Sequence, residues 1–154
     1  MTQDKDLLLK DLCARLPYGV KVSKVVEDWT SEPNPLRSIN LNNIIVEDGE
    51  FEDGTPDIDI WDYEDIKPYL FPLSSMTEEQ TKEVHNLIYQ GVSESVDETK
   101  EWLKTRKENE LRPITLAYIL NDRLVIDWLN KNHFDYRRLI ERGLAIDCTN
   151  LNIY

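Results

Sequence analysis

The chain has 154 residues, of which 40% are hydrophobic and 31% charged, and its 30 acidic and 18 basic residues give a formal net charge of −12. The apolar content suffices for the core of one domain, whereas no run of about 18 apolar residues could span a membrane and the N-terminus lacks a basic, apolar leader. Because an acidic surface repels phosphate groups, we expect no direct binding to nucleic acid or to a membrane.

The first residues predict a helix followed by strands. Leucines at helical spacing and acidic residues in the first turn predict a helix over 4–16, which Pro17 and Gly19 end. Valines that alternate with polar residues predict a half-buried strand over 20–26. After a Pro-rich turn, spaced aliphatic residues predict a second strand over 36–46.

The next segment predicts turns and a third strand. Glu-Asp-Gly occurs at 47–49 and again at 52–54, and Asp-Gly is a strong signal for a tight turn. A third strand is expected over 57–63, with its isoleucines on one face and its aspartates on the other. The three strands predict a small antiparallel sheet or partial barrel.

This same region concentrates the negative charge. Residues 38–66 hold ten carboxylates and no Lys or Arg, which leaves 20 acidic and 18 basic residues elsewhere. We predict an acidic hairpin that suits a basic protein surface or a cation. The candidate partner-binding residues are Glu47, Asp48, Glu50, Glu52, Asp53, Asp57, Asp59 and Asp62.

The second half of the chain predicts helices. Pro68 and Pro72 are expected to lead the chain out of the sheet, and Thr77 with Gln80 forms a capping box for a helix that extends to residue 90. A largely exposed helix is predicted over 95–109. The apolar run 114–120 fits either a strand or a helix.

The last residues predict two more helices. Asn121 is expected to cap a helix with Leu124, Val125 and Trp128 on its apolar stripe, and a short helix is predicted over 137–142 before an extended tail. The predicted fold class is therefore α+β: an N-terminal helix, a small antiparallel sheet or partial barrel of about three strands, and two to four helices. The expected parts are 1–75 and 76–154, or one single domain.

Three stretches carry a resemblance: KDLCARLPYGVKV at 10–22, KPYLFPLSSMTEEQ at 67–80 and DWLNKNHFDYRRLIERGLAIDCTNLNIY at 127–154. Together they resemble small uncharacterised proteins from phage and prophage regions of gut bacteria. The resemblance covers just over a third of the chain and implies a phage accessory protein in the cytoplasm of a bacterial host. It implies no activity, so no functional residue is carried over from it.

Catalytic and metal-binding patterns are weak. A calcium loop that begins at Asp48 would need Gly at its sixth position, where Asp53 stands and Gly54 comes one residue late. His133 has Asp135 nearby, but a His at a helix end more often interacts with the helix carbonyls. Cys13 and Cys148 have no companions at metal-ligand spacing, so we expect two reduced thiols, no metal and no cofactor.

The leading hypothesis is a non-enzymatic phage accessory protein that binds and inhibits a host or phage protein with a basic surface. The target would be a defence or nucleic-acid-handling factor, and the carboxylates would imitate part of the charge of duplex DNA, roughly one per 1.7 Å of axis. One alternative is a small ligand- or metal-binding module. Another is a small enzyme that uses His133 with a carboxylate, and a homodimer is the further partner considered.

Overall fold

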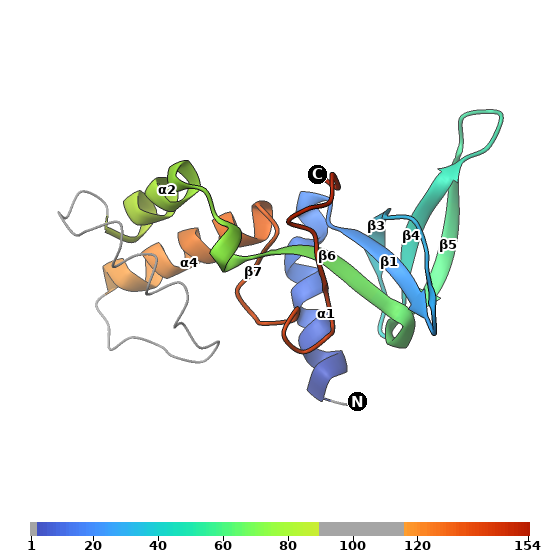
Figure 1. The fold of residues 1–154 in the computed structure, drawn as a ribbon, viewed down its shortest axis with the longest axis horizontal. Coiled ribbons are helices and arrows are strands. Elements are labelled where there is room, and N and C mark those ends of the chain that lie inside the picture. Colours follow the sequence, from blue (N-terminus) through green and yellow to red (C-terminus); the bar gives the residue numbers. More distant parts are fainter. Residues whose placement is uncertain (1–2, 90–115) are drawn as a thin grey trace. The chain divides into compact units, whose positions relative to one another are not determined.

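The computed structural model describes residues 3–89 and 116–154, which belong to two compact units (Figure 1). The first unit comprises residues 1–70 and 139–154, and the second comprises 71–138. The boundary near residue 70 lies close to the predicted division at 75. The C-terminal segment, however, returns to the first unit instead of following the helices before it.

The prediction of a small sheet of about three strands is wrong. The described residues form an eight-stranded mixed sheet, in which the long path runs β5-β4-β3-β1-β6-β7, with β2 beside β1 and β8 beside β6. The pairs are antiparallel except for β6 with β7 and β6 with β8, which are parallel. The strands are β1 Lys21–Val26, β2 Trp29–Thr30, β3 Asn34–Ile39, β4 Asn43–Glu50, β5 Pro56–Asp62, β6 Ile66–Pro72, β7 Phe134–Asp135 and β8 Ile146–Asp147.

Two local misreadings explain two of the missing strands. The predicted strand 36–46 is two strands, β3 and β4, joined by a turn in which the Asn40 amide donates to the Asn43 carbonyl at 2.8 Å. The predicted exit from the sheet is β6, where Pro68 lies opposite Val22 of β1. Proline lowers the expectation of a strand, but Tyr69 and Leu70 are buried, and this burial outweighs the local preference.

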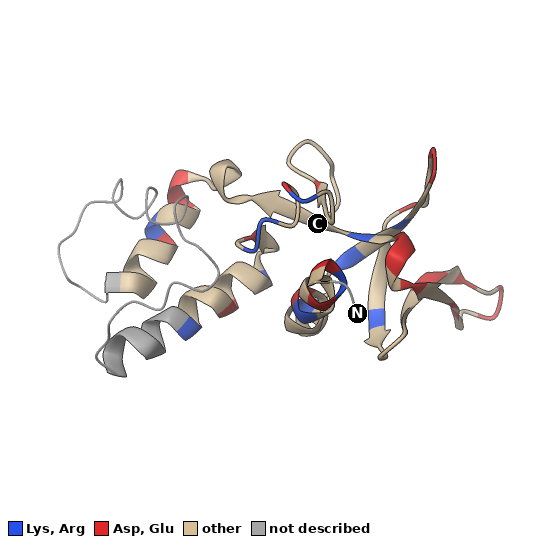
Figure 2. Cartoon of the chain, turned by 90° about the horizontal axis from the view of Figure 1, so that it is seen from below, with Lys and Arg blue, Asp and Glu red and all other residues tan. Residues whose placement is uncertain are grey.

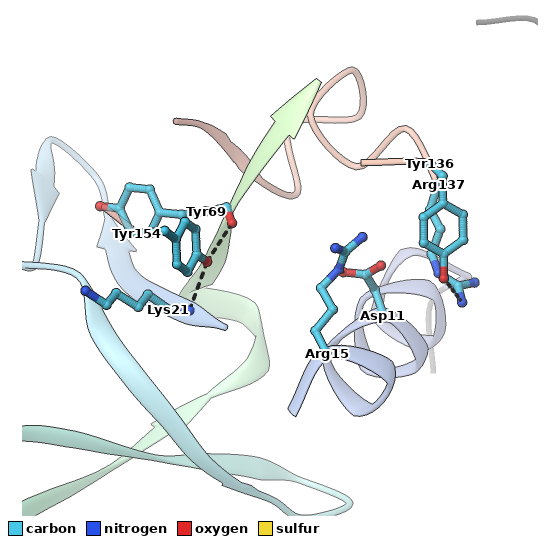
Figure 3. Close-up of polar contacts among 7 residues, drawn as sticks. All are labelled: Asp11, Arg15, Lys21, Tyr69, Tyr136, Arg137 and Tyr154. Atoms are coloured by element: carbon cyan, nitrogen blue, oxygen red, sulfur yellow. Dashed lines mark hydrogen bonds and ion pairs between the residues drawn. The ribbon is translucent and has the colours of Figure 1, made fainter. Parts of the chain in front are cut away.

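In the first unit, helix α1 (Gln3–Arg15) packs on the sheet as its leucine pattern predicts. Leu8 and Leu12 join a core formed with Val20, Val22, Leu36, Ile44, Val46, Trp61, Tyr63 and Ile66. The same helix buries an ion pair in which Arg15 Nε lies 2.8 Å from Asp11 Oδ2, with both side chains fully enclosed (Figure 3). Short 3₁₀ helices follow α1 at Leu16–Tyr18 and β5 at Tyr63–Asp65.

The C-terminal residues are bound to this unit by polar contacts. The Tyr154 hydroxyl donates to the Tyr69 carbonyl at 3.0 Å and accepts from the Lys21 amide at 3.1 Å (Figure 3). Lys21 Nζ also donates to the Ile153 carbonyl at 2.8 Å. A smaller core nearby unites Leu7, Leu70, Leu139 and Ala145, so the chain's two ends stabilise the same unit.

The second unit contains helices α2 (Glu78–Tyr89) and α4 (Leu116–Lys131), β7 with the end of β6, and a 3₁₀ helix at Leu73–Ser75. The Thr77–Gln80 capping box is confirmed, because each residue's side chain binds the other's backbone amide at 2.9 and 3.2 Å. Trp128 stacks on Phe134 at 5.7 Å between ring centres. The core of this unit is Val84, Ile88, Val125, Leu129, Phe134 and Tyr136.

Three helical predictions in the second half have different outcomes. Residues 116–120 are helical, so Asn121 lies inside α4 rather than at its start. The predicted short helix over 137–142 is wrong, because this segment forms turns in which Arg138 has a φ of 61°. The helix predicted over 95–109 lies outside the described residues.

Candidate docking surface

The acidic hairpin is β4, β5 and their connection, residues 43–62. Its base belongs to the core, since Ile44 and Val46 are fully buried and Trp61 is 3% exposed. Beyond that level every residue from Asp48 to Ile60 is exposed except Asp57, which is half-buried. We call residues 48–60 the distal hairpin. Figure 1 shows that its tip reaches past the end of β3, where β4 and β5 pair only with each other, whereas residues 58–60 pair with residues 45–47 at the level of β3.

The two Asp-Gly pairs shape the hairpin in different ways. The pair at 48–49 forms no turn; it lies inside β4 where the register shifts between Glu47 and Glu50, and Gly49 has a φ of 101°. The pair at 53–54 forms the hairpin turn, where Gly54 has a φ of 78° and its amide donates to the Phe51 carbonyl at 2.9 Å. One predicted turn is therefore a bulge and the other is correct.

Four of the eight candidate carboxylates are engaged within the hairpin and its neighbour strand. Glu47 pairs with Arg37 of β3. Asp48 accepts from Asn34 Nδ2 at 3.2 Å. Asp53 accepts from the Thr55 hydroxyl at 2.6 Å and from its amide at 2.9 Å, and these hydrogen bonds lower the pKa of Asp53.

Asp59 is the fourth engaged carboxylate. Its Oδ2 accepts from Trp61 Nε1 at 2.7 Å, and its Oδ1 accepts from the Ile60 amide at 2.8 Å. The carboxylate thus orients the core tryptophan and covers a backbone donor of β5. Within the described part of the chain, the side chains of the other four form no hydrogen bond or ion pair: Glu50, Glu52, Asp57 and Asp62.

The isoleucines of β5 do not face the core, although the sequence reading placed this strand in a half-buried sheet. Ile58 and Ile60 are each 61% exposed, and Phe51 at the turn is 56% exposed. The predicted alternation holds, but Trp61 and Tyr63, which follow Asp57 and Asp59 on the same face, occupy the core side. The alternation identifies two faces, and the larger aromatic side chains decide which face is buried.

The outer edge of β5 is open. The backbone carbonyl of Asn43 accepts from Asn40 and so points to β3. Backbone groups point to alternate sides along a strand, so the N–H and C=O groups of Ile44 and Val46 point to β5, and those of Ile45 point to β3. Ile45 lies opposite Ile60, so the backbone groups of Ile60, and likewise of Ile58, point away from β4. No strand of the described residues pairs with this edge.

Charge and apolar area therefore coincide on the distal hairpin. Figure 2 shows acidic positions along it and no basic ones. The sequence reading found the charge but missed the exposed apolar residues. The signal that could have found them is the presence of Trp61 and Tyr63 in the same strand as the isoleucines, competing for the core side.

The other sequence candidates occupy structural positions. His133 follows α4 with a φ of 58°, its side chain and that of Asp135 are buried, and its carbonyl accepts from the Phe71 amide at 2.9 Å. Cys13 is exposed, whereas burial raises the pKa of the Cys148 thiol to about 12. Arg142, which ends the segment predicted as a helix over 137–142, pairs with Asp4 at 3.0 Å in the first unit.

The residues considered and rejected as a calcium loop form strand, hairpin turn and strand. Within residues 3–89 and 116–154, no three His, Cys, Asp or Glu side chains are gathered as a metal site would require. None of the described helices is long and apolar enough to cross a bilayer. Searches for similar protein families, curated proteins and solved structures give no match to this chain.

Proposed function

We propose that this chain is a non-enzymatic binding protein whose distal hairpin attaches to a basic surface of another protein. One observation carries the proposal: residues 48–60 are almost wholly exposed and combine carboxylates with exposed apolar side chains without one Lys or Arg. Exposed apolar area flanked by charge is typical of interaction sites. The carboxylates set the rate of encounter, and the apolar residues supply contact area.

The partner's class follows from the charge and from the resemblance described above. A protein that handles nucleic acid presents basic grooves shaped for phosphates, and a narrow acidic arm can occupy such a groove. The resemblance to phage-associated proteins suggests a host defence or nucleic-acid-handling factor as the partner, with inhibition as the result. We place this proposal ahead of an enzyme that uses His133, because that residue forms the turn after α4.

Two matched variants test the role of the hairpin. The hairpin variant changes its four unengaged acids, as Glu50→Gln, Glu52→Gln, Asp57→Asn and Asp62→Asn. The control variant removes the same charge from exposed acids elsewhere that have no side-chain partner within the described residues, as Asp6→Asn, Asp28→Asn, Glu79→Gln and Glu141→Gln. Both should fold as the parent does, because exposed charges contribute little individually.

The measurement is association with proteins captured from a bacterial host lysate, followed by kinetics with the purified partner. We expect the hairpin variant to associate at least about tenfold more slowly than the parent at low salt, with a smaller difference at high salt. The control variant should retain most of the parent's rate. Equal losses in the two variants would assign the effect to net charge, and no loss in either would remove the hairpin from the interface.

A further inference from the structure

The outer edge of β5 has the features of a site for an added strand. Its backbone groups at Ile58 and Ile60 point away from β4, and the side chains of both residues are 61% exposed. Edges of this kind are templates for pairing with another extended chain, with backbone hydrogen bonds supplying affinity and side chains supplying selectivity. Exposed isoleucines beside an open edge increase that tendency.

The side-chain pattern of β5 specifies what would pair with it. Ile58 and Ile60 lie on one face of the strand, whereas Asp57 and Asp59 lie on the other. A neighbouring strand places its own side chains beside these on the same two faces. Apolar residues would therefore lie beside the isoleucines and basic residues beside the aspartates, at alternating positions.

We propose that the partner adds an extended segment of alternating basic and aliphatic residues to the edge of β5. This inference rests on the proposed function and deepens it, because it names the form that the basic partner takes. Arginine suits the basic positions, since its guanidinium group pairs with carboxylates in two-point geometry. Valine or isoleucine suits the apolar positions, since branched side chains pack well across neighbouring strands.

Asp59 adds selectivity for a basic strand. Its Oδ1 accepts from the Ile60 amide at 2.8 Å, so one outward backbone donor of the edge is covered in the free protein. A basic side chain arriving on the same face attracts this carboxylate and releases the amide for pairing. A neutral strand has no basic side chain to attract the Asp59 carboxylate. The Ile60 amide would then stay bonded to Asp59 and could not pair with that strand.

The charge pattern also argues against a second copy of the chain at this edge. Two β5 edges pairing with each other would bring Asp57 and Asp59 of one molecule close to the same residues of the other. Like charges placed across neighbouring strands are destabilising. A basic segment relieves this repulsion, so charge complementarity selects it over self-association.

The test uses three eight-residue peptides and the full-length chain. One alternates Arg and Val, one has the same composition as four Arg followed by four Val, and one alternates Gln and Val. Affinity is measured by fluorescence anisotropy of labelled peptide at low salt. We expect the alternating Arg-Val peptide to bind at least about tenfold more tightly than either other peptide, because only it matches both faces of β5.

Two protein variants complete the test. Ile58→Thr with Ile60→Thr keeps strand propensity and removes apolar area from an exposed face, so it should weaken the alternating Arg-Val peptide at least about threefold and leave the block peptide unchanged. The hairpin variant should weaken both Arg-containing peptides. The parent alone should sediment as a monomer, because the edge of β5 does not pair with a second copy.

The outcomes separate the two proposals. If the alternating and block peptides bind the parent equally and both lose affinity in the hairpin variant, strand addition is wrong and docking by charge stands. If the Arg peptides bind the parent and the hairpin variant equally, or do not bind, both proposals fail. A parent dimer that the two Ile→Thr changes abolish would show that a second copy occupies the edge, which also overturns strand addition by a basic partner.

Discussion

The two ends of the acidic hairpin are built from the same two strands and differ in what supports them. At its base, Ile44, Val46 and Trp61 pack with α1 in a core that excludes water. Towards the tip of the distal hairpin, β4 and β5 pair only with each other and contain a bulge at Gly49 and a turn at Gly54. The base therefore contributes to the stability of the unit. The exposed charge and apolar area of the distal hairpin contribute little to that stability and are available for binding.

The largest expected contrast compares two ion pairs. Asp11 and Arg15 are fully enclosed, whereas in the Glu47–Arg37 pair of the hairpin Arg37 is 57% exposed. Asp11→Ala should lower the free energy of unfolding by about 3–5 kcal/mol, because it leaves a buried guanidinium without this carboxylate. Glu47→Gln should cost about 0–1 kcal/mol. Urea unfolding of both variants checks this, and equal costs would remove the distinction between an enclosed and an exposed ion pair.

A second contrast compares apolar residues. Leu12 is fully buried in the core, whereas Ile58 is exposed. Leu12→Ala should cost about 2–5 kcal/mol, since it removes buried methyl groups and leaves a cavity. Ile58→Ala should change the free energy of unfolding by no more than about 0.5 kcal/mol. A cost above 2 kcal/mol for Ile58→Ala would mean that the isoleucine face packs against something and is not available for docking.

The sequence predicts the parts of the fold that local patterns determine. The leucine spacing of α1 and the Thr77–Gln80 capping box are visible in the sequence and present in the structure. The sheet is harder, because its strands are joined by tertiary packing. Pro68 lies in a buried strand, and the turn at Asn40 divides what the aliphatic spacing presents as one strand.

The candidate surface was predictable in part for the same reason. The clustering of carboxylates is visible in the sequence, but the contacts that each carboxylate makes are not. Asp53 and Asp59 accept hydrogen bonds from backbone amides and so stabilise the local backbone, whereas Glu50 and Asp57 do not. Such assignments depend on side-chain geometry, which period-two alternation leaves open.

The smallest contrast concerns the two thiols and alkaline pH. Burial, with the nearby Asp147 charge, raises the pKa of Cys148 from 9.0 to about 12. The folded state therefore favours the neutral thiol. Its contribution to stability is complete below about pH 9 and is lost as the pH rises from 9 towards 12.

Cys148→Ala should reduce the loss of stability between pH 9 and 11, as followed by urea unfolding at each pH. In the native parent at pH 8, a thiol reagent should label Cys13, which is exposed, and spare Cys148. Cys13→Ala is the matched control and should leave the alkaline slope unchanged. Labelling of both thiols at equal rates would contradict the enclosed position of Cys148.

The most direct test of the central claim, that the distal hairpin docks a basic partner, is amide hydrogen exchange of the full chain with and without the alternating Arg-Val peptide. The outward amides of Ile58 and Asp62 should exchange rapidly in the free protein and slow at least about tenfold at saturating peptide. The Val46 amide, which faces β5, should change much less. Unchanged exchange at Ile58 and Asp62 under conditions where the peptide is bound would contradict the account, since the peptide would then occupy another surface.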